Sequence, residues 1–547
     1  MTTHEVRNQP PPFGGYDLLA GDPALVAALD RWSPSRGDVT ELARLAATSD
    51  PARWADQADT YPPVLRTHDA VGNRLDEVDY HPAYHALMTV AVGHGLGAEP
   101  WLANAGTGAH VRRATGFYLW SQVENAHLCP VSMTYAAGPA LRHTPALAGE
   151  WLPRLASRVY DPRLVPVADK AGAIVGMGMT EKQGGSDVRA NTTTATPDVA
   201  GPLGSDSVRL TGHKWFCSAP MSDGFLVLAQ GPDGLGCYLL PRVLPDGTRN
   251  AFAIQRLKNK LGNRANASSE VEFAGTWATP VGEPGRGIRT ILDMVAATRL
   301  DCILGSAATI RQALARAVHH TQHRAAFGAT LIDQPLMRNV LADLAVESEA
   351  ATLLALRLAH AIDEGESDFA RLGVAIGKFW VCKRTSPAVA EALECLGGLG
   401  YIEENGLARL YREAPLNSIW EGSGNVNALD VLRAITREPA SLAALAKECA
   451  LARGAISLVD TAIDEIESVS TQAYAADAPW LARSLVERLA LTLQASLLVR
   501  YAPPEVAEAF ALTRLGPDRG LTFGTLPAAI ASGAPGRILI DRATPRR

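Results

Sequence analysis

The period of the hydrophobic residues changes twice along this chain, and this order limits the possible folds more than any other feature. Residues 1–171 have the pattern of helices interrupted by Pro and Gly, and residues 172–285 that of short strands between Gly, Pro and Asp clusters. From residue 286 onward the apolar residues again recur at helical spacing. Helical and strand patterns therefore occupy single blocks, which argues against alternating βαβ units of the Rossmann kind and favours separate helical and β layers.

Individual segments support this order. In the first block, Asp38 is expected to open one helix, and His110–Cys129 to form another. The β block is expected to contain short strands at Ala173–Met179, Val208–Leu210, Lys214–Ser218, Phe225–Ala229, Cys237–Leu240 and Glu270–Phe273. A turn is expected at Gly212, between the second and third of these strands. The sequence thus predicts a mainly α protein with a central β domain, in four segments: 1–171, 172–285, 286–438 and an appended helical segment, 439–547.

The length, net charge and cysteine content of the chain exclude several classes of protein. A chain of 547 residues exceeds the size of one hydrophobic core, so several domains are expected. The net charge of −6 makes the molecule no polycation, and contact with nucleic acid would need a local basic patch. Seven dispersed cysteines without a C-x-x-C pair indicate reduced thiols, and no apolar run suits a secretion signal or membrane span. We therefore expect a cytoplasmic protein.

A turn rich in Gly and hydroxyl residues follows the first expected strand of the β block. Gly184 and Gly185 permit backbone conformations closed to other residues and let a ligand approach the main chain. Thr180 and Ser186 carry hydroxyls that both donate and accept hydrogen bonds. Such a turn suits the edge of a planar polar ring or a phosphate, although an ordinary surface loop has the same composition.

Aromatic residues precede a hydroxyl at the end of a later strand. Trp215 and Phe216 offer ring faces that can flank a flavin, and Ser218 can donate a hydrogen bond to the edge of that ring. A strand with buried aromatic side chains is the alternative interpretation.

Two segments of the third block suit a nucleotide. Arg324, with Phe327 three residues later and Gln334 beyond it, can bind a pyrophosphate and stack an adenine; a solvated arginine at a helix end is the alternative. The three glycines at 397, 398 and 400 exceed the needs of a helix C-cap and favour close approach of a phosphate.

Glu421 is the candidate general base. It lies in a Gly-rich turn beside Trp420, where burial would raise the carboxyl pKa toward the range that suits a base at neutral pH. The alternative is a carboxylate that merely stabilises the start of the following helix.

Together these segments resemble the acyl-CoA dehydrogenase family over roughly residues 80–435. Gly178–Asp187 matches its first signature apart from Lys182–Gln183, and Glu394–Glu413 matches its second, with Glu394 where Gln is common. Phe216 stands where ordinary members have Trp. The resemblance implies a helical domain, a β-barrel domain and a four-helix bundle, which is the order that the periodicity predicts.

The resemblance also implies FAD, held between subunits. The residues implied for the flavin are Met179, Thr180, Gly185, Ser186, Phe216, Cys217 and Ser218. The adenine diphosphate part would be held from the partner chain, by Arg324, Phe327, Gln334, Gly397, Gly398 and Gly400. Ser423 and Asn425 would contact the cofactor near Glu421.

Glu421 aligns with the base that removes the proton α to a thioester carbonyl while flavin N5 accepts a hydride from the β carbon. Some members place this base elsewhere, but Thr298, beside Arg299, occupies that position here. The resemblance therefore implies that the turn from Thr180 to Ser186, Phe216 and Glu421 face one isoalloxazine ring. The substrate would be a small acyl-CoA or a related compound. No residues that define an acyl-chain pocket or a CoA phosphate site are recognisable, so the sequence does not identify the substrate.

The extra length points to one branch of the family, the AidB-type flavoproteins of the bacterial alkylation response. Arg500–Tyr501–Ala502–Pro503–Pro504 and Asn8–Gln9–Pro10 resemble this branch. It implies a homotetramer built as a dimer of dimers, modest dehydrogenase activity and binding of double-stranded DNA, for which the candidate residues are Arg433, Arg514, Arg519 and Arg542. Scattered arginines on a solvated face are the alternative.

The sequence also permits a different flavin chemistry and raises the question of a metal site. A flavin oxidase or monooxygenase of a biosynthetic pathway could use the same scaffold. His319 and His323 have the i, i+4 spacing of metal ligands, and His320 lies between them, but no carboxylate accompanies them at ligand spacing. No metal is therefore expected.

Overall fold

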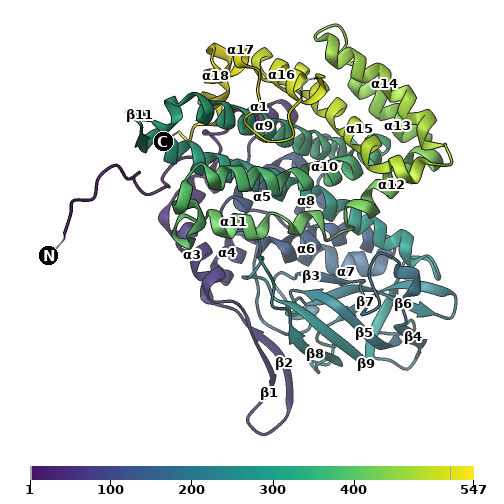
Figure 1. Ribbon diagram of the computed structural model, residues 1–547. Helices are drawn as coiled ribbons and strands as arrows, with labels where there is room; N and C mark the ends of the chain where they lie inside the picture. The colour runs from purple at the N-terminus through teal and green to yellow at the C-terminus, as the bar shows by residue number, and fades with distance from the viewer. Residues whose placement is uncertain (1–2, 518, 547) are drawn as a thin grey trace. The chain divides into compact units, whose positions relative to one another are not determined.

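The structure is a computed structural model that describes residues 3–517 and 519–546 (Figure 1). Its internal contacts divide the chain into two compact units. The first, here called the helical unit, comprises Met1–Ser49, Ala105–Gln122 and Arg299–Arg547. The second, called the β unit, comprises Asp50–Asn104 and Val123–Thr298.

A closed ring of strands forms the centre of the β unit. The order β6–β4–β5–β9–β7 returns to β6 through a pairing of β6 with β7, while β3 pairs with β6 and β8 with β9. The bounds of the strands are β3 Val175–Gly178, β4 Thr194–Pro197, β5 Val208–Ser218, β6 Gly224–Gly231, β7 Gly234–Pro241, β8 Phe252–Leu257 and β9 Ser268–Val281. The strand-rich block therefore forms a β domain, as the periodicity predicts, and this domain is a barrel, as the family resemblance implies.

Alternating side chains of these strands fill the barrel. Leu210, Phe225, Val227, Phe252 and Val271 belong to one cluster of buried residues. β6 is apolar throughout its middle, so it lies between covered faces, whereas β5 alternates between buried and exposed residues at its start.

The prediction of a turn at Gly212 is wrong. β5 runs without interruption through this residue, where Gly212 takes a φ of +149° and the pairing with β9 is irregular on either side. A Cβ atom at Gly212 would lie 2.5 Å from the Thr193 hydroxyl oxygen. The glycine therefore lets the adjoining chain approach closely and does not reverse the strand.

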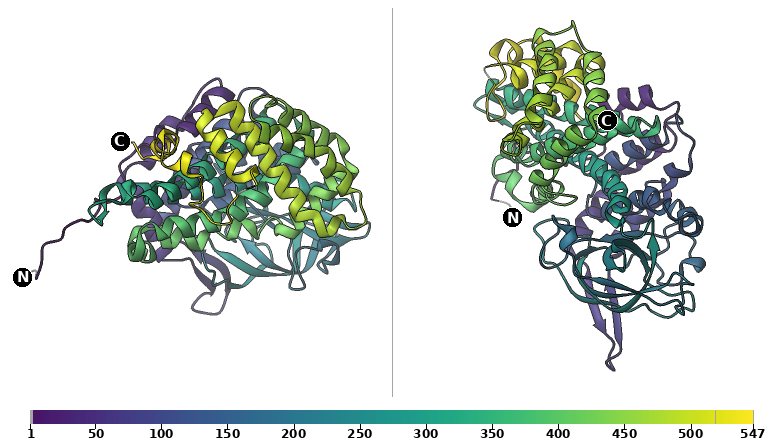
Figure 2. Two further views of the ribbon diagram at one scale, coloured as in Figure 1. Left: turned by 45° about the horizontal axis from the view of Figure 1, so that its top comes forward. Right: turned by 90° about the vertical axis from the view of Figure 1, so that its right-hand side faces the viewer.

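The first block also contains strands, contrary to the expectation of helices alone. β1 (Val64–His68) and β2 (Arg74–Asp79) form an antiparallel hairpin beside β8, and Figure 2 shows it projecting from the barrel. Its side chains are mostly polar and none of β1 is fully buried. Without an apolar alternation, the sequence carries little strand signal there. The helices of the β unit are α3 Ser49–Thr60, α4 Pro82–Gly93, α6 Leu128–Leu141 and α7 Pro145–Leu155.

Long helices build the helical unit, to which α8 (Gly287–His323) contributes from Arg299 onward. α9 (Pro335–Asp363) packs against α10 (Ser367–Glu394), and α10 packs against α12 (Gly424–Arg437). The remaining helices of this unit are α1 Pro23–Trp32, α2 Val39–Ala46, α5 Ala109–Ser121, α11 Leu407–Glu413, α13 Pro439–Ala450, α14 Ser457–Ala473, α15 Ala478–Tyr501, α16 Pro504–Phe510, α17 Ala528–Ala531 and α18 Ala534–Ala543.

The C-terminal helices pack directly on α9, α10 and α12. α15 contacts α9, α10 and α12, α13 contacts α10, and α18 contacts α9 (Figure 1). Among the described residues, no helix is both long and apolar enough to cross a membrane.

Candidate active site

The Gly-rich turn after β3 is anchored by a buried ion pair. The Glu181 carboxylate accepts hydrogen bonds from Lys214 Nζ at 2.8 Å and from the main-chain N–H groups of Thr192 and Thr193 at 2.7 and 3.1 Å. Neither Glu181 nor Lys214 is exposed to solvent. Burial opposes ionisation of Glu181, but these hydrogen bonds hold its pKa well below the usual range. Lys214 belongs to β5, so the pair joins two motifs whose connection the sequence did not reveal.

The candidate flavin residues of this turn lie on its accessible side. Ser186 is exposed, and Met179 and Thr180 are half-buried. Gly184 has a φ of +141° and open space where a side chain would be. Gly185 is needed for packing, because a Cβ atom would lie 2.3 Å from the Thr180 hydroxyl oxygen. The turn therefore presents main chain and hydroxyl groups with room for a ligand.

The end of β5 divides its residues between two faces. Phe216 is 49% exposed, and Lys258 Nζ lies 4.6 Å from the centre of its ring. The Ser218 hydroxyl oxygen is 3.1 Å from that of Ser268. The Cys217 side chain lies in the barrel core, so only its main chain could contact a cofactor.

Glu421 occupies an unusual backbone conformation. Its φ is +58° and that of Gly422 is +94°, so two successive residues lie in the left-handed region. This region is unfavourable for a residue as large as Glu, and such conformations persist where the surroundings enforce them.

Cations hold the carbonyl groups of this turn. Lys378 Nζ, from α10, donates to the carbonyl oxygens of Trp420 at 2.7 Å and Gly422 at 2.5 Å. Arg299 Nε, from α8, donates to the carbonyl oxygen of Glu421 at 3.0 Å. Sequence reasoning noticed Arg299 only as a neighbour of Thr298 and missed Lys378, since neither is close to Glu421 along the chain.

Further side chains fix these donors. Asp430 accepts from Arg299 at 2.7 Å and from Arg371 at 3.0 Å. Burial opposes ionisation of Asp430, but the two arginines keep its pKa below the usual value. Asn427 Nδ2 donates to the carbonyl oxygens of Gly422 and Ser423 at 2.6 and 3.0 Å. Glu421 therefore lies in a turn whose carbonyl groups are held by side chains of three helices.

The candidate adenine residues lie at the end of α8. Phe327 forms the tip of a short hairpin, with a φ of +52° and a completely exposed side chain. Arg324 Nη1 donates to the carbonyl oxygen of Asn8 at 2.7 Å, and the Asn8 side chain bonds both main-chain groups of Ala325 at 2.8 Å. Gln334 Nε2 donates to the carbonyl oxygen of Ala326 at 3.0 Å. The N-terminal segment thus holds this hairpin in place.

The three glycines after α10 have different roles. Gly397, with a φ of +59°, and Gly398 have open space where a side chain would be. A Cβ atom on Gly400 would lie 2.2 Å from the carbonyl oxygen of Leu393. Gly397 and Gly398 therefore remain candidates for close approach of a phosphate, whereas Gly400 permits the chain to pack on the end of α10.

Cations surround the start of α12, where Ser423 and Asn425 are exposed. Arg483 Nη1, from α15, lies 3.4 Å from the Asn425 side-chain oxygen. Burial, with the nearby charges of Arg483 and Lys378, lowers the pKa of Lys383. Arg483 lies in the appended segment and was not predicted, because nothing in the sequence links α15 to this turn.

The candidate nucleic-acid residues do not share one environment. Arg433 and Arg519 are exposed, at 56% and 54% of their side chains. Arg514 is instead enclosed, with Nη2 at 2.6 Å from Asp343 and 3.0 Å from Glu347. These two buried carboxylates draw the guanidinium inward, so the structure does not place Arg514 in a basic surface stripe. Arg542 is likewise engaged by Glu349.

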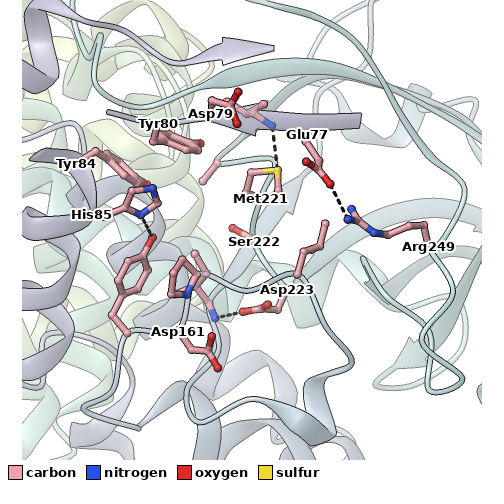
Figure 3. A pocket seen from close by; sticks show the side chains of 16 residues that line it. Glu77, Asp79, Tyr80, Tyr84, His85, Asp161, Met221, Ser222, Asp223 and Arg249 are labelled. Carbon is pink, nitrogen blue, oxygen red and sulfur yellow. Dashed lines mark hydrogen bonds and ion pairs between the residues drawn. The ribbon is translucent and has the colours of Figure 1, made fainter. Parts of the chain in front are cut away.

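A separate pocket of about 430 Å³ lies within the β unit (Figure 3). Tyr80 and Tyr84 stack at 4.2 Å along one wall, where His85 Nδ1 contacts the Tyr160 hydroxyl at 3.0 Å. Burial raises the pKa of Asp223, on the opposite wall, to about 6. None of the sequence-predicted site residues lines this pocket.

Family models match most of the chain. Residues 8–162 match the N-terminal domain of the adaptive response protein AidB, residues 176–276 the middle domain of acyl-CoA dehydrogenases and residues 285–436 their C-terminal domain. The "putative acyl-CoA dehydrogenase AidB" of Escherichia coli is 43% identical over 95% of this chain and 96% of its own.

Solved structures share the fold. ACDH-11 of Caenorhabditis elegans, in complex with C11-CoA, superposes with a TM-score of 0.83 at 26% identity and covers 97% of both chains. An acyl-CoA dehydrogenase of Bacillus anthracis complexed with FAD has a TM-score of 0.65 at 16% identity, over 89% of this chain and 84% of its own. The similarity at this lower identity concerns the fold alone.

Proposed function

This chain belongs to the AidB-type branch of the acyl-CoA dehydrogenase family, and we propose that it binds FAD and removes the α-proton of an acyl thioester with Glu421. The observation that carries the proposal is the conformation of Glu421, a half-buried carboxylate in the left-handed region with its flanking carbonyl groups bound by cations. Such enforced strain occurs at functional sites.

The residues of both units fit FAD by their chemistry. In the β unit, the open Gly184, the exposed Ser186 hydroxyl and the exposed ring of Phe216 offer hydrogen bonds and a face for a planar ring. In the helical unit, the exposed ring of Phe327 and the uncovered main chain at Gly397 and Gly398 suit an adenine and a phosphate. Ser423 and Asn425 would contact the same cofactor beside Glu421.

In this reaction the residues of the protein orient the thioester and accept the proton from its α carbon. An ionised Glu421 accepts the proton from the α carbon, and a general base in this role contributes roughly 10²–10⁴-fold to the rate. Main-chain N–H groups of the turn donate to the thioester carbonyl and stabilise the charge that develops on its oxygen. Bound FAD supplies an acceptor for the hydride of the β carbon.

Anaerobic addition of acyl-CoA esters of increasing chain length to the FAD-loaded protein tests this function. We expect loss of the oxidised flavin absorbance with at least one ester. Glu421→Gln should abolish it while FAD stays bound, whereas Glu467→Gln, which changes an exposed carboxylate on α14, should leave it intact.

A protein that takes up no FAD would refute the proposal, as would a Glu421→Gln variant that is reduced at the rate of the wild type. Rapid reaction of the reduced flavin with O₂ would instead favour an oxidase or monooxygenase. The cytoplasmic location, tetramer and binding of double-stranded DNA implied by the AidB-type resemblance are further proposals. For DNA, Arg433 and Arg519 are the exposed candidates.

A further inference from the structure

The ammonium group of Lys378 is buried, and no carboxylate of the described residues forms an ion pair with it. Lys378 is 1% exposed, and no ion pair is found for it within residues 3–517 and 519–546. Burying a charge is costly unless hydrogen bonds or an opposite charge compensate it. The compensation here is the pair of carbonyl oxygens on either side of Glu421, at 2.7 and 2.5 Å.

These contacts determine which way the peptide groups of the turn face. In a trans peptide the C=O and N–H bonds point in opposite directions, and no cis peptide bond occurs among the described residues. Lys378 draws the carbonyl of Trp420 toward α10, so the N–H of Glu421 points away from α10. By the same geometry, the bond of Arg299 to the Glu421 carbonyl turns the N–H of Gly422 away from Arg299.

The conformation of Glu421 depends on these contacts, because the residue lies outside the φ range that its side chain favours. The left-handed φ of Glu421 is unfavourable for a side chain of its size, so the turn would relax if its carbonyl groups were released. Asn427 supports only the later carbonyls, those of Gly422 and Ser423. Lys378 is therefore the group that binds both sides of Glu421 at once.

We propose that Lys378 is the positioning residue of the base: its ammonium holds the flanking carbonyl groups so that the carboxylate and the N–H of Glu421 face the thioester together. Lys378 touches neither substrate nor cofactor in this role. The inference rests on the proposed function of Glu421, but the conformational part can be measured without any turnover.

The variants Lys378→Met and Lys378→Arg in the full-length protein test the inference, with Lys447→Met as the control that removes an exposed lysine from α13. Hydrogen exchange of the segment 419–424 is the first measurement. We expect exchange at least tenfold faster in Lys378→Met than in the wild type, partial restoration by Arg, and no change in Lys447→Met.

Single-turnover reduction of the FAD-loaded protein by an acyl-CoA is the second measurement. Lys378→Met should lower the limiting rate constant at least tenfold while the acyl-CoA concentration at half-maximal rate changes less than threefold. This split indicates loss of an interaction made in the transition state. Lys378→Arg, which keeps the charge and the donors, should recover part of the rate.

The inference is overturned if Lys378→Met leaves exchange at 419–424 within twofold of the wild type. It is also overturned if exchange rises equally throughout the helical unit, because Lys378 would then support the fold as a whole. A wild type that no acyl-CoA reduces refutes the proposed function alone, since the exchange comparison still decides whether Lys378 holds the turn.

Discussion

Lys214→Met should destabilise the β unit substantially. The variant leaves the buried carboxylate of Glu181 without its cation, and loss of one partner of a buried ion pair costs about 3–5 kcal/mol. The N–H groups of Thr192 and Thr193 continue to donate to that carboxylate, so we expect the lower end, about 3 kcal/mol. The midpoint of thermal unfolding of the β unit should fall by roughly 6–12 °C.

The loss should depend on pH with a defined sign. Folding lowers the pKa of Glu181, so the pair contributes its full stability above the unfolded-state pKa of about 4.3. That contribution is lost as the pH falls through the folded-state pKa. Without Lys214 the carboxyl takes up a proton more readily, so the difference in stability between wild type and variant should shrink as the pH falls from 7 to about 4.

Urea unfolding at a series of pH values, combined with hydrogen exchange of peptides from β3 and β5, measures both effects. Lys182→Met, an exposed lysine of the same turn, is the matched control and should change the free energy of unfolding by less than about 0.5 kcal/mol. Adding Glu181→Gln to Lys214→Met should recover about 1 kcal/mol, because the uncompensated charge is removed. A Lys214→Met protein as stable as the control, or a loss that is the same at pH 7 and pH 4, would refute the reasoning.

Two further predictions concern the assembly and its partners. Arg433→Ala should weaken salt-sensitive binding of duplex DNA in a fluorescence anisotropy titration without lowering stability. Arg514→Met should instead lower the free energy of unfolding by about 3 kcal/mol, because it leaves the buried Asp343 without its cation, while Glu347 keeps its pairing with Arg384. Equal effects of both variants on DNA binding would contradict the placement of Arg514. Phe327→Ser should reduce the mass found by light scattering, because a completely exposed aromatic ring suits a subunit contact, and an unchanged mass together with an unchanged FAD affinity would argue against an interface there.

The elements with strong periodicity could be predicted from sequence. Ala173–Met179 contains β3, Phe225–Ala229 lies in β6, and the helical blocks form helices, because apolar side chains at regular spacing must be buried together. The hairpin β1–β2 could not, since its side chains are mainly polar and its pairing is held by the backbone. The prediction of a turn at Gly212 was wrong because the sequence does not distinguish a glycine that permits close approach of another chain segment from a glycine that forms a turn.

The residues of the candidate site likewise differ in whether they could be predicted from sequence. Glu421, Phe216 and the Gly184–Gly185 turn can be named as candidates from sequence because their motifs are contiguous, and their roles remain predictions. Lys378 was not, since it lies 40 residues or more from the carbonyl groups that it binds. In sequence alone, a lysine in a helix such as α10 cannot be assigned to the interior or to the surface, because its burial depends on how the helices pack.

The contacts of α15 have a consequence for dissecting this protein. Because α15 packs on α9, α10 and α12 and brings Arg483 to Asn425, it is part of the hydrophobic core of the helical unit beside the turn of Glu421. A chain ending near Glu438 would expose those apolar faces to water and lose Arg483 from the start of α12. Truncation therefore cannot separate the tail from the flavoenzyme, and the two must be told apart by single substitutions at the surface.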